Sequence, residues 1–423
     1  MAIHLPAGDA TSLEANAFPV TRFYAWRVFA LSVGLMLSDY ISRQILNATF
    51  PALKAEWALS DTQLGALVSV VALGVGVLSF PASLLADRCG RVKSVSIMAL
   101  LWSVATIACG MSGNYAGMFM ARAAVGIGEA GYASAGGAIL VSVFPRRLHG
   151  TIINSFLSAA LFGSVSGLVL GGTLAQRHGW RTAFFIIGAG GLVLSLLYVA
   201  GVREPRAHAA QVKTHLPVKD VLKRLLTTKT ALWTYLGSGL MMFIQGALLA
   251  WMPSLMNRYY GFDMTRAGAT TGLLVIAGGV GMIAGGALVD YLSARRGVRR
   301  LRIMVGFALC YFALLLIAFQ LQPGNPQLLA VAAAFLTGSG FVGASGVIVT
   351  AVSPPAIHAS AFAMLTLANN ILGYAPGPFI VGLLADASGL LTAMQILPLA
   401  GLGAAAAFLI ADRYYDNDAQ QTR

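Results

Sequence analysis

Four charged residues lie inside long apolar stretches of this sequence, where a charge is costly. Asp39 and Arg43 are four positions apart in the first stretch, and Arg122 and Glu129 are seven positions apart in the fourth. A charged side chain at the centre of a bilayer costs roughly 2.5 to 3.5 kcal/mol on insertion scales, so charges retained there are candidates for function. Each spacing places both side chains on one helix face, and we expect both faces to point inward.

These buried acids and bases favour the binding of protons together with an anion. Burial favours the protonated form of a carboxyl group, whereas a nearby guanidinium favours its charged form. We therefore expect Glu129 and Asp39 to serve proton coupling, and Arg122 and Arg43 to hold an anionic substrate. An anion that engages Arg122 would weaken its hold on Glu129, which would then take up a proton. The alternative is a static ion pair that ties the fourth stretch to its neighbours.

The elements that position these residues are long apolar runs. Of the 423 residues, 57% are hydrophobic and 10% are charged, and the mean hydropathy is +0.76, whereas soluble domains carry roughly 25% charged residues. A helix crosses a bilayer with about 20 apolar residues, and barrel strands would alternate instead. The sequence therefore predicts an all-α integral membrane protein with twelve transmembrane helices in two six-helix lobes. The expected spans are 26–49, 63–85, 94–112, 115–144, 151–175, 181–201, 231–257, 266–290, 303–322, 327–352, 359–386 and 389–411.

The positive charge of the chain follows the same division. Its formal net charge is +13, and the basic residues recur in alternate loops, which argues against a nucleic-acid partner. This pattern predicts that the basic loops and both termini lie in the cytoplasm. The expected location of the protein is a bacterial inner membrane. The expected segments are a cytoplasmic start (1–25), a first lobe (26–201), a linker with an amphipathic surface helix (202–230), a second lobe (231–411) and a cytoplasmic tail (412–423). The alternative for the linker is a plain basic connection.

Equivalent loops of the two halves carry equivalent motifs. Asp87, Arg88 and Arg91 follow the second span, and Asp290 and Arg295 follow the eighth. Two six-span units in the same orientation are typical of a two-lobed secondary transporter. We expect these five residues to form a gate between the lobes, the alternative being a charge cluster that only sets the topology.

The chain resembles the major facilitator superfamily over nearly its whole length. The loop sequence from Leu85 to Arg91 is similar to the loop motif of that family. A narrower resemblance, to bacterial members of the spinster-like branch, is carried by Arg122 to Gly131, Leu59 to Gly65 and Trp251 to Pro253. The resemblance implies two lobes that rock around a midplane site, and proton-driven movement of lysophospholipids or sphingoid phosphates.

One departure from the family lies in the first span. Relatives usually read Asn-Tyr-x-Asp-Arg-Gln there, whereas this chain reads Asp39-Tyr40-Ile41-Ser42-Arg43-Gln44, with Ser42 in the place of the aspartate. Asp39 lies one turn earlier on the same face, about 4.5 Å along the helix. Our hypothesis is that Asp39 replaces the missing carboxylate; the alternative is that it has no role in coupling.

The second half carries no charged residue deep in a span. Its candidate substrate-binding residues, which would act with Tyr40 and Gln44 of the first half, are Gln245, Trp251, Asn369, Asn370 and Tyr374. A sugar acid would require hydrogen-bond donors from both lobes, because unpaired polar groups in a dry site are costly, whereas an amphiphile would not. This asymmetry predicts an amphiphilic, anionic, lipid-like substrate. The alternative is a carrier of small organic anions such as sugar acids, or a multidrug efflux carrier.

Other function classes lack their signatures in this sequence. It contains no nucleotide-binding loop, no His-Glu-x-x-His and no Cys/His cluster, so we expect no enzyme, no metal and no cofactor beyond the proton gradient. A receptor or scaffold with the same fold would have lost the loop motifs and buried charges, and both are present. The expected partners are the substrate, protons and membrane lipids, and the chain is expected to be a monomer.

Overall fold

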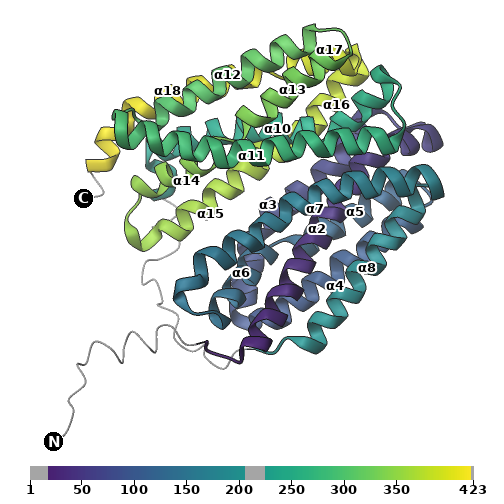
Figure 1. Cartoon of the computed structure of the whole chain (residues 1–423), viewed down its shortest axis with the longest axis horizontal. Helices are drawn as coiled ribbons and strands as arrows, with labels where there is room; N and C mark the ends of the chain where they lie inside the picture. Colours follow the sequence, from purple (N-terminus) through teal and green to yellow (C-terminus); the bar gives the residue numbers. More distant parts are fainter. Residues whose placement is uncertain (1–17, 205–223, 421–423) are drawn as a thin grey trace, which may run out of the picture.

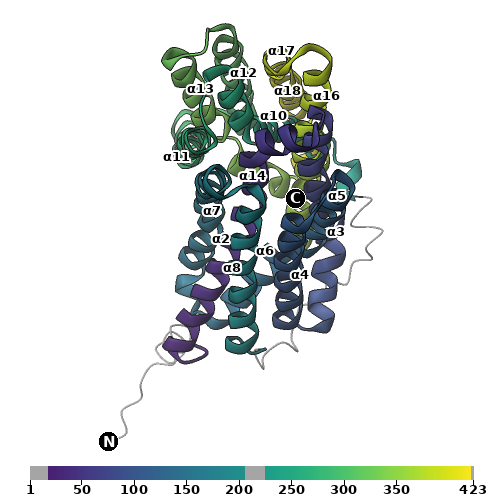
Figure 2. The ribbon, with the colours of Figure 1, turned by 90° about the vertical axis from the view of Figure 1, so that its right-hand side faces the viewer.

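The computed structural model describes residues 18–204 and 224–420, and every regular element within these ranges is a helix. The helices form two bundles, one from each half of the chain (Figure 1). A view turned by 90° shows the same division, with α2 to α8 in the first lobe and α10 to α18 in the second (Figure 2).

The first lobe follows the chain from α2 onward. Its helices are α2 (Arg22–Trp57), α3 (Asp61–Cys89), α4 (Arg91–Met111), α5 (Tyr115–Glu129), α6 (Tyr132–Val143), α7 (His149–His178) and α8 (Trp180–Gly201), with a 3-10 turn η1 (Arg146–Leu148) before α7. The fourth span is divided into α5 and α6 because Gly131 adopts a left-handed backbone (φ 86°) that interrupts the helix.

The second lobe repeats this order. Its helices are α10 (Lys229–Tyr260), α11 (Met264–Arg296), α12 (Arg300–Gln320), α13 (Asn325–Gly338), α14 (Val342–Ala351), α15 (His358–Ala368), α16 (Pro376–Ser388), α17 (Leu390–Ile396) and α18 (Leu399–Gln420). A 3-10 turn η2 (Pro355–Ile357) precedes α15, and a π-helix η3 (Asn369–Tyr374) joins α15 to α16.

The predicted all-α membrane fold is confirmed. Within the described residues, eleven helical stretches are long and apolar enough to cross a membrane by length and composition. The helix α2 supplies the remaining expected span; it has 36 residues, and its buried face includes polar side chains such as Asp39, Gln44 and Asn47. Each expected span falls on one helix or on consecutive helices of the same stretch.

The ends of some segments differ from the expected boundaries. The helix α2 continues past its expected end at Thr49 to Trp57, and α18 continues to Gln420, through most of the expected tail. The expected amphipathic helix of the linker lies largely outside the described residues, which include only a helical end at 224–227. A hydrophobic run gives the length of the membrane-embedded part, and helices extend beyond it into polar surroundings.

The lobes meet toward one end of the molecule, which we call the Asp61 end. Described polar contacts between the lobes join Asp61 to Arg258, Asp386 to the backbone of Asp61 and Thr62, Gln176 to Met264, and Asn47 to Leu249. The loops that carry the basic motifs lie at the opposite end, which we call the basic-loop end. The ribbons of the two lobes diverge toward that end, where the C-terminus lies (Figure 1).

Glycines bring the backbones of the two lobes together at the Asp61 end. A Cβ atom added to Gly65 of α3 or to Gly382 of α16 would lie 2.4 Å from a carbonyl oxygen of the other helix. The same holds between α7 and α11, where a Cβ added to Gly172 or Gly268 would lie 2.2 Å from a carbonyl oxygen across the interface. Both helix pairs are reciprocal, so each lobe provides a glycine and a carbonyl group to each contact. Small residues permit this close approach of helices.

The end of α2 is fixed to α8 of the same lobe. The Trp180 indole Nε1 donates to Glu56 Oε2 at 2.6 Å, and Arg181 Nη1 donates to Glu56 Oε1 at 2.7 Å. The hydrogen bond from Trp180 lowers the pKa of Glu56, with a further contribution from Arg181, so the carboxylate is charged at neutral pH. Because of this clamp, the last turns of α2, which include Lys54, belong to the first lobe.

We expect Gly268→Ala to separate the lobes at the Asp61 end, because the new methyl group would meet a backbone carbonyl oxygen at 2.2 Å. The measurement is the distance between spin labels at His178 and Gln322, two exposed positions at this end, in protein whose three cysteines have been replaced. That distance should lengthen. The control is Gly286→Ala in the same helix, where an added Cβ would meet nothing within 4 Å. An unchanged distance in Gly268→Ala would contradict the tight interface.

Candidate functional site

Arg43 lies at the centre of the buried charges of the first lobe and contacts two carboxylates. Its Nε lies 3.2 Å from Oδ1 of Asp39, one turn earlier on α2, and 2.9 Å from Oε2 of Glu129 on α5. Its Nη2 donates to Oδ2 of Asp39 at 3.4 Å. The side chain of Arg43 is 23% exposed, whereas those of Asp39 and Glu129 are 4% and 0% exposed. Arg43 is therefore the member of this cluster that a ligand can reach.

Glu129 is held at the break between α5 and α6. It is the last residue of α5, and Ala130 and Gly131 then leave the α-helical conformation. Both carboxylate oxygens are buried and accept no hydrogen bond from the described residues, because the Nε–H of Arg43 is directed at Asp39. A buried carboxylate with an ion pair and no hydrogen bond is incompletely satisfied, and protonation would remove the charge that burial disfavours.

Arg122 does not pair with Glu129, which corrects the expected competition between these two residues. Its Nε donates to the carbonyl of Leu67 on α3 and its Nη1 to the carbonyl of Ser42 on α2, both at 3.4 Å. The residue is 1% exposed. Seven residues correspond to about 10.5 Å along a helix, so a shared face does not bring these two side chains into contact. The cation beside Glu129 is Arg43, where Arg122 was expected. Arg122 instead joins α5 to α2 and α3.

Tyr40 and Gln44 extend the site along α2. The Arg43 Cζ atom lies 5.0 Å from the centre of the Tyr40 ring, in a cation–π contact. Gln44 Oε1 accepts a hydrogen bond from Asn47 Nδ2 at 2.7 Å, and the same nitrogen reaches the carbonyl of Leu249 in the second lobe at 3.5 Å. The Oδ1 atom of Asn47 is buried and has no partner among the described residues.

The candidate amides of the second lobe bind within their own lobe. Asn369 Oδ1 accepts from Ser238 Oγ at 2.7 Å, and Asn370 Nδ2 donates to the carbonyl of Thr366 at 2.9 Å. Gln245 Nε2 donates to Ser339 Oγ at 3.1 Å, while its buried Oε1 atom has no partner in the part of the chain that the structure describes. Each of these three amides therefore uses part of its hydrogen-bonding capacity within the second lobe.

Trp251 and Tyr374 have different surroundings. Trp251 is fully buried, its Nε1 donates to the carbonyl of Pro378 at 3.0 Å, and its ring centre lies 5.2 Å from that of Phe50 in the first lobe. It therefore belongs to the packed contact between the lobes, and a substrate cannot reach it in this structure. Tyr374 is half-buried in η3 and packs against Gly246 of α10.

The residues expected to form a gate are separated from the lobe contacts. Asp290 pairs with Arg300 at 3.3 Å, and the Arg295 Cζ atom lies 5.7 Å from the ring centre of Tyr291, so both have partners in the second lobe. Arg88 is exposed and Arg91 is half-buried, and the side chain of Asp87 lies outside the described residues. The role of these residues as a gate stays a prediction for a state in which the basic-loop end is closed.

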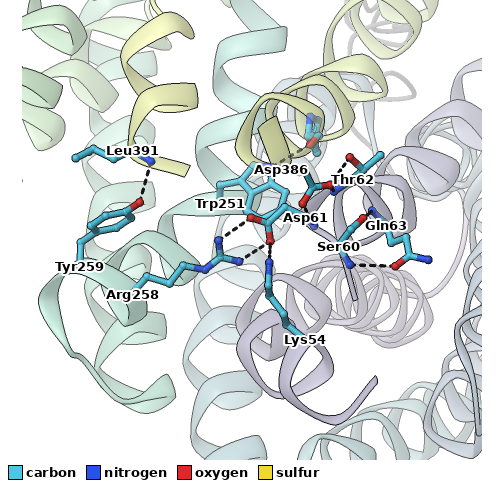
Figure 3. Close-up of polar contacts among 11 residues, drawn as sticks. Lys54, Ser60, Asp61, Thr62, Gln63, Trp251, Arg258, Tyr259, Asp386 and Leu391 are labelled. Atoms are coloured by element: carbon cyan, nitrogen blue, oxygen red, sulfur yellow. Dashed lines mark hydrogen bonds and ion pairs between the residues drawn. The ribbon is translucent and has the colours of Figure 1, made fainter. Parts of the chain in front are cut away.

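A charge cluster at the Asp61 end joins the lobes, and we call Asp61, Lys54, Arg258 and Asp386 the Asp61 lock. Arg258 Nη1 and Nη2 of the second lobe donate to the two carboxylate oxygens of Asp61 at 2.7 and 2.6 Å. Lys54 Nζ lies 2.5 Å from Asp61 Oδ1. Figure 3 shows both cationic side chains converging on this one carboxylate.

The same cluster closes the start of α3. Asp386 accepts from the backbone N–H groups of Asp61 at 2.7 Å and Thr62 at 2.8 Å, so a carboxylate of the second lobe caps a helix of the first (Figure 3). Within the first lobe, Ser60 and Gln63 form a reciprocal capping box on this helix. Both arrangements satisfy N–H groups that the first turn of a helix leaves unpaired.

The expected site did not include the Asp61 lock. The capping box from Ser60 to Gln63 could have indicated that Asp61 begins a helix, directly after the expected first loop. Arg258, however, follows an apolar run and is indistinguishable in sequence from a charge that only marks the end of a span. Among the described residues, no group of three or more His, Cys, Asp or Glu side chains could hold a metal ion.

Known proteins resemble this chain along most of its length. The family model of the Major Facilitator Superfamily matches residues 33–378. An MFS-type efflux pump of Mycolicibacterium smegmatis is 28% identical over 368 residues, 86% of this chain and 85% of that protein. A hexuronate transporter of Bacillus subtilis is 25% identical over 291 residues, 66% of this chain and 69% of that protein.

A solved structure shares the fold. It is the crystal structure of a bacterial homologue of the human lysosomal transporter Spinster in an inward-facing and occupied conformation, with a TM-score of 0.85 and 20% identity over 94% of this chain and 99% of that one. The expected two-lobed, spinster-like fold is thus confirmed.

We expect Arg43→Met to lower the melting temperature of the detergent-solubilised protein, because it leaves two neighbouring carboxylates without their cation. Removing one partner of a buried ion pair costs roughly 3 to 5 kcal/mol. Adding Glu129→Gln should restore part of the loss, since it removes one of the uncompensated charges. Arg177→Met, at an exposed position at the end of α7, serves as the control. A double variant that melts no higher than Arg43→Met would contradict the shared ion pair.

Proposed function

Because the chain belongs to the Major Facilitator Superfamily, we propose that it is a proton-coupled secondary transporter of an amphiphilic, anionic, lipid-like substrate. The observation that carries the proposal is Arg43, a partly exposed cation shared by two buried carboxylates. Transport proceeds by alternating access, in which the two lobes rock around a midplane site.

Arg43 links substrate binding to proton uptake. An anionic head group that pairs with the guanidinium draws it away from Glu129, whose carboxylate is 0% exposed. A buried carboxylate without a counter-ion is unfavourable, so Glu129 takes up a proton. Asp39 stays one helical turn from Arg43 and limits the change in charge around it. When the proton leaves, Glu129 again competes for the guanidinium and favours release of the anion.

The basic loops indicate how the protein is oriented in the membrane. Loops rich in Arg and Lys remain on the cytoplasmic side of an inner membrane, so the basic-loop end faces the cytoplasm and the Asp61 end faces the outside. In this orientation the Asp61 lock closes the outer side, and the structure is in the inward-open state. The functional unit is a monomer, since each lobe finds its partner within the chain.

The second lobe supports an amphiphile as the substrate. Its candidate amides, Gln245, Asn369 and Asn370, direct their described hydrogen bonds to groups of the same lobe. A head group held by Arg43 would therefore meet its charge partner in the first lobe, while its tail lies against apolar side chains of the second. The sequence from Arg122 to Gly131, which resembles the spinster-like branch and through it implies lysophospholipids or sphingoid phosphates, supports this substrate class.

Small organic anions such as sugar acids are the second candidate. Buried Asn47 Oδ1 in the first lobe and Gln245 Oε1 in the second lack hydrogen-bond donors among the described residues. Hydroxyl groups of a sugar acid would supply such donors, with its carboxylate on Arg43. A relative of this chain is a hexuronate transporter.

We expect a lysophospholipid or a sphingoid phosphate to induce proton flux in proteoliposomes, and Glu129→Gln to abolish this flux, because the amide cannot exchange the coupled proton. The measurement is the signal of a pH-sensitive dye inside the vesicles, with a hexuronate tested side by side. Protein-free vesicles control for leakage caused by the lipids. Asp416→Asn, which removes an exposed carboxylate, should retain the flux.

The outcomes separate the two substrate classes. A flux induced only by the hexuronate overturns the lipid-like substrate and keeps the coupling through Glu129. A flux that Glu129→Gln leaves unchanged removes that residue from proton coupling.

A further inference from the structure

We propose that Lys54 keeps the charge of Asp61 compensated when the lobes separate at the Asp61 end, and so favours the outward-open state. Arg258, on the same carboxylate, favours the closed outer side. The two cations of the Asp61 lock would therefore act in opposite directions on the alternating-access equilibrium. This inference rests on the alternating access proposed above, but not on the identity of the substrate or on proton coupling.

The first step of the argument is that one carboxylate has two cations from different lobes. Lys54 of α2 lies 2.5 Å from Oδ1 of Asp61, and Arg258 of α10 binds both oxygens at 2.6 and 2.7 Å. The side chain of Asp61 is 4% exposed, whereas those of Lys54 and Arg258 are 38% and 26% exposed. The acid is thus buried where the two cations converge (Figure 3).

The second step is that only one of these ion pairs crosses the interface. Lys54 and Asp61 both belong to the first lobe, and the clamp from Glu56 to Trp180 and Arg181 fixes the end of α2 within that lobe. Arg258 belongs to the second lobe, where its Cζ atom lies 6.0 Å from the ring centre of Trp251. A rigid-body separation of the lobes therefore breaks the pair of Asp61 with Arg258 and keeps its pair with Lys54.

The third step concerns the repulsion between the two cations. While the lobes are in contact, Nζ of Lys54 and Nη2 of Arg258 approach the same oxygen atom, Oδ1 of Asp61, and like charges at such distances repel. After separation, Lys54 has the carboxylate to itself and the repulsion is gone. Lys54 therefore stabilises the separated state more than the closed state, whereas the bidentate pair of Arg258 stabilises the closed state alone.

The first turn of α3 receives one cap from each lobe. The cap from Asp386 to the N–H groups of Asp61 and Thr62 crosses the interface and is lost on separation. The Ser60 side chain, which accepts from Gln63 N–H at 3.1 Å, stays with α3. On separation the first turn of α3 therefore keeps the cap from Ser60, while the N–H groups of Asp61 and Thr62 lose Asp386.

We expect Arg258→Met and Lys54→Met to shift the population of open molecules in opposite directions. The measurement is the distance distribution between spin labels at His178 and Gln322, in nanodiscs without substrate and without a pH gradient. Arg258→Met should raise the ratio of open to closed molecules by about tenfold, since it removes charge-assisted bonds present only in the closed state. Lys54→Met should lower that ratio by about threefold, the size expected for a partly exposed pair.

Matched variants separate this mechanism from general effects of charge. Lys54→Arg keeps the cation and should leave the ratio near that of the unmodified chain. Arg177→Met removes an exposed cation at the same end and should change nothing. If Arg258→Met fails to fold, Arg258→Lys, which loses the bidentate geometry, should raise the ratio to a smaller extent.

Two results would overturn the proposal. The first is a higher ratio in Lys54→Met, because Lys54 would then be an ordinary part of the lock, and the second is an unchanged ratio, because Lys54 would then have no influence. The experiment uses no substrate. Opposite shifts of the ratio in Arg258→Met and Lys54→Met therefore support this inference even when lysophospholipids and hexuronates fail to drive proton flux. Proton flux that is normal while both variants shift the same way would keep the proposed function and reject this inference.

Discussion

The first lobe depends on the guanidinium of Arg43, which two buried carboxylates share. Asp39 and Glu129 can both be buried beside it because a single cation lies 3.2 and 2.9 Å from their oxygens, but one cation cannot compensate two anions fully. The ion pairs of the Asp61 lock have the opposite composition, with the single carboxylate of Asp61 beside two cations. In each cluster the central group, Arg43 or Asp61, keeps one counter-ion when its other partner leaves. This property makes buried ion pairs suitable for a cycle of states.

The interface between the lobes combines two kinds of contact. The reciprocal glycines of α3 with α16 and of α7 with α11 bring backbones close enough that a Cβ atom would collide, which fixes the closed position sterically. The charges of the Asp61 lock add attraction that depends on the distance between the lobes. Packing of glycine against carbonyl groups is lost with a small separation, so both contacts favour one well-defined closed position over a range of intermediate ones.

The sequence predicted the fold because the length of an apolar run directly reflects the thickness of a bilayer. It also placed Asp39 and Arg43 on one helix face, and a separation of four residues brings these two side chains together without tertiary information. The partner of Glu129 could not be read in the same way, because Arg43 reaches it from another helix. Trp251 was expected to bind substrate but is packed against Phe50; an aromatic residue in an apolar run gives no indication of whether it faces a neighbour or a ligand. Arg258 was missed because its partner, Asp61, lies 197 residues away.

The distribution of charge between α2 and α5 also bears on how the protein enters the membrane. Each of these helices carries one acid and one base well inside the corresponding expected span, Asp39 with Arg43 and Arg122 with Glu129. During synthesis α2 reaches the translocon well before α5 exists, and at that time the contact between Arg43 and Glu129 cannot form. Each helix is nevertheless neutral in its membrane-embedded part, which reduces the insertion cost that an unmatched charge would impose. The ion pair between Arg43 and Glu129 can form only once α5 is in place, so assembly of the lobe adds a second carboxylate to a cation that Asp39 already compensates.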